Sequence, residues 1–129
     1  MFNTIYDETL GILRCQADGL VSTAEVEKRR AEARRLTEVC RARHGDLKVL
    51  VLCGSSAQTD DVVAASRRHR ETLNGPYDRI ALVYPSSLAK LEGHRSFHSS
   101  VENVFLSQDA AITWLLADRG AARCPANAA

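Results

Sequence analysis

Three hydroxyl side chains follow the most apolar run of the chain, and they could bind a phosphate or be phosphorylated. The run Leu47–Cys53 is nearly all apolar and contains no Pro or Gly. Ser55, Ser56 and Thr59 come next, and the two acidic residues after Thr59 suit the positive end of a helix. Free backbone N–H groups at a helix start bind anions, so the three residues are candidates for ligand binding or phosphorylation. Turn and cap chemistry uses the same residue types, and this alternative stays open.

Two other side chains nearby could carry out a different chemistry. Cys53 ends the apolar run, where the dipole of the following helix would favour a nucleophilic thiolate. His69 falls on the apolar stripe of the next predicted helix, where it could line a pocket together with Ser66. An enzyme that uses Cys53 or His69 is therefore one hypothesis. The structural alternatives are a packed core cysteine and a hydrogen-bonded histidine at the edge of the core.

A metal or another cofactor is not expected. His94 and His98 are four residues apart, a spacing that can hold a metal on one helix face. No glutamate stands between them as in HExxH, and no third ligand is marked, so two solvated histidines are the favoured interpretation. The sequence also has no Gly-rich phosphate loop, paired-carboxylate signature or zinc knuckle.

The elements that would position these side chains alternate between strands and helices. An apolar run without polar alternation is typical of a strand buried on both faces, so residues 47–53 are predicted to be the central parallel strand. Its carboxyl end would then carry the serine-rich bend, at the edge where open α/β sheets bind ligands. Further strands are predicted at 79–84 and 101–106, and helices at 22–44, 59–73, 86–98 and 107–118.

The first two predicted strands, 2–6 and 10–17, determine the rest of the topology. They stand too close together for a parallel return, so they must form an antiparallel hairpin. We therefore predict an α/β fold with a mostly parallel five-stranded sheet and an antiparallel N-terminal hairpin, in the order β-β-α-β-α-β-α-β-α. It forms a single domain at 1–118, and 119–129 are expected to be a flexible C-terminal tail.

The first predicted helix has clear signals at both ends and a highly charged surface. Ser22 begins it in a capping box with Glu25, and Gly45 is its C-terminal cap. Its buried stripe is Val26, Ala33, Leu36 and Cys40. The remaining positions are dense in Arg, Lys and Glu. A basic patch is one interpretation, but a solvated face with ion pairs such as Glu25–Arg29 is favoured because acids are interleaved.

Composition limits the classes of function. The 129 residues are 45% hydrophobic and 26% charged with a net charge of +1, which argues against a partner held by clustered basic charge, such as nucleic acid or a membrane surface. No apolar run approaches the ~20 residues of a membrane span, and residues 1–7 lack the features of a secretory signal. The four cysteines form no CxxC, so we expect a reduced, cytoplasmic setting.

Several local patterns point to one family. They are the turn Asp18–Thr23 into a capped helix, the strand end Leu50–Cys53, the stretch Asp78–Val83 and the closing segment Val104–Leu115. With the order of elements, these patterns resemble the SpoIIAA-like, or STAS/SEC14-like, group of small bacterial proteins over residues 2–117.

The resemblance implies functions as well as a fold. In STAS domains that regulate sigma factors, a serine beginning the helix after the central strand is phosphorylated, which points to Ser55, Ser56 or Thr59 here. We therefore expect a non-enzymatic regulatory or binding module that acts through protein–protein contact, possesses a phospho-switch and forms a homodimer. SEC14-like relatives imply an alternative, a carrier that holds a lipid or another small apolar or anionic ligand between helices and sheet. The identity of the partner stays open.

Overall fold

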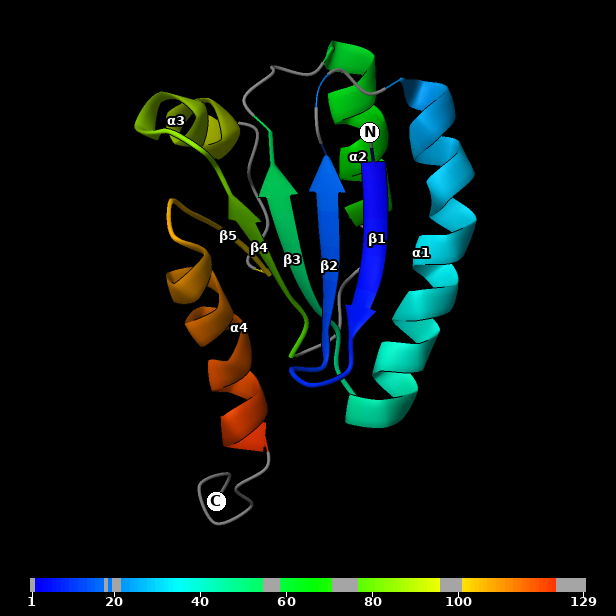
Figure 1. Ribbon diagram of the computed structural model, residues 1–129, viewed down its shortest axis with the longest axis vertical. Coiled ribbons are helices and arrows are strands. Elements are labelled where there is room, and N and C mark those ends of the chain that lie inside the picture. The colour runs from blue at the N-terminus through cyan, green and yellow to red at the C-terminus, as the bar shows by residue number, and fades with distance from the viewer. Residues whose placement is uncertain are drawn as a thin grey trace.

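The computed structural model describes residues 2–17, 19, 22–54, 59–70, 77–95 and 101–122. Within these residues the elements follow the predicted order (Figure 1). The strands are β1 (Phe2–Asp7), β2 (Ile12–Ala17), β3 (Lys48–Cys53), β4 (Arg79–Val83) and β5 (Glu102–Phe105). The helices are α1 (Thr23–His44), α2 (Asp60–Arg70), α3 (Ser87–Arg95) and α4 (Gln108–Ala122).

The strands form one mixed sheet whose neighbours follow chain order, β1-β2-β3-β4-β5. β1 pairs antiparallel with β2, and β2 to β5 are parallel to one another. The predicted α/β class, with a mostly parallel five-stranded sheet and an N-terminal hairpin, is therefore confirmed. β3 is the middle strand, flanked on both sides, which confirms that residues 47–53 lie in the interior of the sheet.

Helices cover both faces of the sheet, with α1 and α2 on one side and α4 on the other (Figure 1). The strands advance in one direction across the sheet, and right-handed crossovers then place their connecting helices on one face. α4 follows the last strand, so it is free to cover the opposite face.

Two buried clusters, one on each face, explain why the central run is apolar throughout. The cluster under α1 consists of Leu13, Leu36, Cys40, Leu47, Val49 and Ile80. The cluster under α4 consists of Ile12, Leu50, Ala81, Ala111 and Leu115. Val49 and Leu50 are consecutive in β3 and pack on opposite faces, so both positions must be apolar.

The N-terminal hairpin differs from the prediction at its turn. The second strand begins at Ile12, not at residue 10, because residues 8–11 form the turn. The Asp7 carboxylate accepts the Leu10 N–H at 3.1 Å, and the Gly11 N–H donates to the Asp7 carbonyl at 2.8 Å. Gly11 has φ +68°, a conformation that glycine adopts without steric cost.

Side-chain caps begin three of the helices as the sequence predicts. Ser22, Ser86 and Ser107 each accept a backbone N–H three residues further on, at 3.1–3.2 Å. Gly45 ends α1 with φ +75°, and its N–H donates to the Arg41 carbonyl. α4 extends to Ala122, beyond the predicted end at 118, and residues 123–129 lie outside the described part.

Candidate functional site

The carboxyl ends of β2 to β5 meet at one edge of the sheet, here called the carboxyl edge. The parallel register pairs Cys53 at the end of β3 with Ala17 at the end of β2, and Leu52 with Val83 at the end of β4. The chain leaves β3 at this edge and enters α2 a few residues later (Figure 1). Residues 54 and 59, the two ends of the predicted bend, therefore lie at the edge where the sequence places the candidate site. Ser55 and Ser56 themselves lie outside the described residues.

Thr59 is the described member of the three hydroxyl candidates. It is exposed directly before α2, and its hydroxyl donates to an Asp61 carboxylate oxygen at 2.5 Å. This hydrogen bond is the main cause that lowers the pKa of Asp61, because it stabilises the carboxylate. Asp60 and Asp61 are both exposed in the first turn, where the helix dipole favours negative charge.

The cysteine and histidine candidates are only partly tested by the structure. Cys53 is a half-buried thiol at the end of β3. Cys15 lies one strand away on the same face of the sheet, and burial raises the pKa of its thiol. His69 belongs to α2, but its side chain lies outside the described ones, as does that of Ser66. A role for Cys53 or His69 in catalysis stays a prediction.

Three large apolar side chains are exposed at the carboxyl edge, and the sequence analysis did not anticipate them. Leu88 and Leu91 on α3 are 68% and 61% exposed, and Leu106, directly after β5, is 49% exposed. α3 follows the carboxyl end of β4 and packs against β5 (Figure 1). The three leucines therefore lie at the same end of the sheet as the carboxyl end of β3. α3 exposes two leucines within one helical turn, and exposed apolar surface of this kind indicates a contact site.

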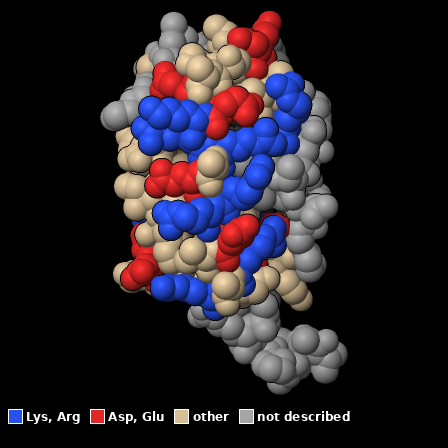
Figure 2. Space-filling model, turned by 90° about the vertical axis from the view of Figure 1, so that its right-hand side faces the viewer, with Lys and Arg blue, Asp and Glu red and all other residues tan. Residues whose placement is uncertain are grey.

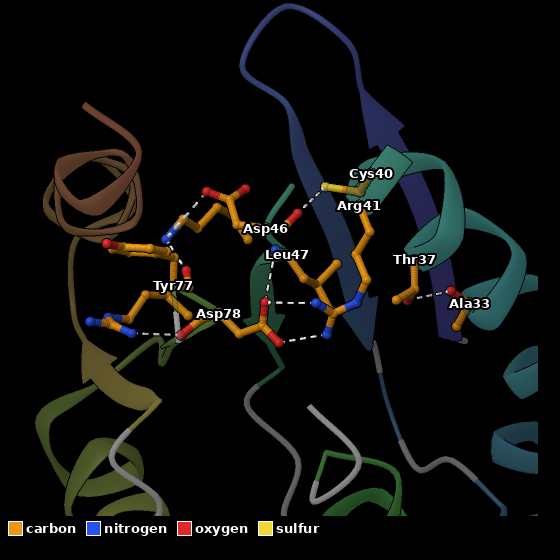
Figure 3. Close-up of polar contacts among 10 residues, drawn as sticks. Ala33, Thr37, Cys40, Arg41, Asp46, Leu47, Tyr77 and Asp78 are labelled. Atoms are coloured by element: carbon orange, nitrogen blue, oxygen red, sulfur yellow. Dashed lines mark hydrogen bonds and ion pairs between the residues drawn. The ribbon is translucent and has the colours of Figure 1, made fainter. Parts of the chain in front are cut away.

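A buried polar network lies at the opposite edge, where the amino ends of β3 and β4 meet (Figure 3). Asp78 precedes β4 and is 1% exposed. One of its carboxylate oxygens accepts from Arg41 Nη1 at 3.1 Å and from the Leu47 N–H at 3.0 Å, and the other accepts from Arg41 Nη2 at 2.5 Å. Asp78 thus ties the last turn of α1 to the starts of two neighbouring strands.

Lys48 and Asp46 extend this network toward the other face of the sheet, because Lys48 alternates with Val49 along β3. Lys48 is fully buried, its ammonium donates to the Tyr77 carbonyl, and it lies 3.9 Å from an Asp46 carboxylate oxygen. The Asp46 carbonyl in turn accepts from the Cys40 thiol at 3.6 Å. Every charge here has a partner of opposite sign or a backbone partner, as a buried charge requires. The network is suited to holding the strands in register.

A positional signal in the sequence could have revealed this network. Asp46 and Asp78 each stand immediately before a buried strand, and Lys48 and Arg79 are register partners in those strands. Charged residues at matching positions of two adjacent strands are expected to lie together at one edge of the sheet.

The outer surface of α1 carries interleaved charges of both signs (Figure 2). Ion pairs at i,i+3 join Arg30 to Glu27 and both Arg29 and Arg35 to Glu32. The favoured interpretation, a solvated face with ion pairs, agrees with these exposed pairs. Each pair observed on the face has i,i+3 spacing, and among the described residues Glu25 and Arg29 do not form the ion pair given as an example.

The two histidines considered as metal ligands are the remaining candidates from the sequence. His94 lies in α3 with its side chain outside the described ones, and His98 lies outside the described residues. Where side chains are described, no group of three or more His, Cys, Asp and Glu residues could hold a metal ion.

Trp114 of α4 is half-buried. Its ring centroid lies 5.6 Å from that of Phe105, and the Arg79 guanidinium lies 5.8 Å from the Trp114 ring centroid.

Comparison of the chain with protein-family models, curated proteins and solved structures finds no match. The likeness to the SpoIIAA-like group therefore stays a prediction. None of the helices in the described residues is both long enough and apolar enough to cross a bilayer.

Proposed function

We propose that this chain is a non-enzymatic regulatory module of the cytoplasm, with a SpoIIAA-like topology, which acts through protein–protein contact at the carboxyl edge. Phosphorylation between residues 55 and 59 would switch that contact. The observation that supports the proposal is the position of β3, which is the central strand and leads directly through the bend to the exposed Thr59. Such a position is where open α/β sheets present their binding surfaces.

The local charges indicate how a phosphoryl group on Thr59 would act. It would replace the hydroxyl that donates to Asp61 and add a charge of about −1.5 to −2 next to two exposed carboxylates. The backbone N–H groups at the start of α2 attract anions, but Asp60 and Asp61 already occupy this positive end. The modified edge would therefore repel an acidic partner surface and attract a basic one. This switch requires no rearrangement of the sheet.

The test compares phosphorylation and partner binding in the cells that make the protein. Tagged wild-type chain is purified and its peptides are mapped by mass spectrometry, with one added phosphoryl group expected within residues 55–59. A Ser55→Glu, Ser56→Glu and Thr59→Glu variant should lose or exchange the proteins that cross-link to the wild type. Thr113→Glu is the matched control, because Thr113 is an exposed threonine on α4 away from the bend, and it should keep the wild-type partners. An unmodified bend together with an unchanged partner set in the triple variant would refute the proposal.

A further inference from the structure

Three exposed leucines form an apolar patch that the proposed phospho-switch does not use. They are Leu88, Leu91 and Leu106, here called the leucine patch. Leu88 and Leu91 are one helical turn apart on α3 and so project from one side of it. α3 packs against β5, the outermost strand, and Leu106 directly follows that strand. The leucine patch thus lies beside the last strand of the sheet, and all three of its side chains are exposed.

The charge of the surrounding chain favours a copy of the same chain as the occupant. In the flanking stretches 85–91 and 106–108, Lys90 is the single charged residue, and its side chain is half-buried. Ser86 and Ser107 are exposed and neutral, and their hydroxyls cap helices. Glu92 follows Leu91 in the chain, and the exposed Asp109 follows Leu106 by three residues, so charges of both signs border the leucines. Across a two-fold axis, Lys90 of one copy can therefore face an acidic residue of the other, at the polar rim of an interface whose core is apolar.

The geometry and the area of the patch also suit a symmetric contact. Across a two-fold axis, Leu88 of one copy can pack on Leu91 of the other and the reverse, because an isologous interface pairs the same patch with itself. The three leucines expose roughly 300 Å² of apolar surface per copy, taking a whole leucine as about 180 Å². A standard interface buries about 800 Å² per partner, so the leucines would supply its apolar core and their polar neighbours its rim. We propose that the leucine patch is the centre of a homodimer interface.

The test is sedimentation velocity of the unphosphorylated full chain over roughly 1 to 200 µM, the range in which a dissociation constant in the micromolar region is resolved. The wild type should be a dimer at the upper end. Leu91→Glu places two like charges across the two-fold axis and should weaken dimerisation by at least about 100-fold. Ile5→Glu is the matched control, because Ile5 is a 56% exposed apolar residue on β1, and it should dimerise as the wild type does.

Far-UV circular dichroism and the urea midpoint show that each variant is folded, which is expected because both side chains are mostly exposed. A wild type that stays monomeric over this range, or a Leu91→Glu chain that still dimerises, would overturn the proposal. If the wild type is monomeric but Leu91→Glu loses a cellular partner, the patch binds a different protein. The homodimer is then wrong while regulation through the bend remains open, because the purified chain carries no phosphate in this experiment.

Discussion

Replacing Asp78 by Ala tests whether the buried network at the amino ends of β3 and β4 holds the strands and α1 together. The substitution removes a side chain that is 1% exposed and accepts hydrogen bonds from the Arg41 guanidinium and from the Leu47 N–H. The two donors are affected differently. The Arg41 side chain is 36% exposed and can turn toward water, whereas the Leu47 N–H stays buried.

The expected loss follows from these contacts. Leaving the Leu47 N–H without an acceptor costs about 1–3 kcal/mol, and losing a charge-assisted hydrogen bond costs about 1.5–3 kcal/mol. Breaking a fully buried ion pair costs about 3–5 kcal/mol, and the partial exposure of Arg41 places Asp78→Ala at the lower end of that range. We expect a loss of about 3 kcal/mol in the free energy of unfolding. Arg41→Ala should cost a similar amount, because it removes two charge-assisted hydrogen bonds from the buried Asp78 carboxylate.

A double-mutant cycle in urea measures the coupling between Asp78 and Arg41. The two single variants and the double variant should give an interaction energy of about 2 kcal/mol, since each single change removes the same bidentate pair. Glu8 and Arg43 provide the matched control, because their ion pair at 3.5 Å is exposed on both sides and should couple by less than about 0.5 kcal/mol. If the Asp78–Arg41 pair couples no more strongly than Glu8–Arg43, the reasoning about burial is wrong.

Two further predictions concern single positions. Gly45→Ala should destabilise the fold by about 1 kcal/mol, because φ is +75° while an added Cβ meets no atom within 4 Å; the cost is then purely conformational, and an unchanged urea midpoint would contradict it. Asp7 has its pKa lowered, chiefly by the hydrogen bond from the Leu10 N–H. The stability that its carboxylate provides is therefore present above its unfolded pKa of about 3.9 and lost as the pH falls through the lower folded value. The difference in unfolding free energy between wild type and Asp7→Asn should shrink between pH 6 and pH 2.5, and a constant difference would contradict the assignment.

The architecture was predictable because its signals are local and repeated. Uninterrupted apolar runs identify strands buried on both faces, serine caps mark the starts of helices, and a gap too short for a crossover requires the hairpin. The turn at 8–11 was missed because Leu10 continues the apolar pattern, while the backbone bonds around Asp7 and Gly11 close the turn instead. Apolar character alone does not distinguish a turn residue that packs on the core from a strand residue.

The leucines of α3 show that periodicity predicts a helix but does not predict which of its residues are buried. The sequence places Leu88 and Leu91 on a helix, and the structure confirms the helix. Burial, however, depends on whether another element covers that side of the helix, and this is a tertiary property. α3 is short and packs beside the edge strand β5, and among its described side chains Ser87, Leu88 and Leu91 are exposed. The network around Asp78 was missed for the same reason, because its members are separated by up to 37 residues along the chain.

The two edges of the sheet thus differ in a way that separates stability from binding. At the amino edge the charges are buried and paired, so a change there alters the free energy of unfolding before it alters any surface. At the carboxyl edge the described side chains that bear on function, Thr59 and the leucine patch, are exposed. Substitutions at these positions should therefore leave folding nearly unchanged, since surface changes are usually within about 0.5 kcal/mol. A surface that can be charged or modified at so little cost to the fold is what a regulatory contact requires, because both of its states must remain folded.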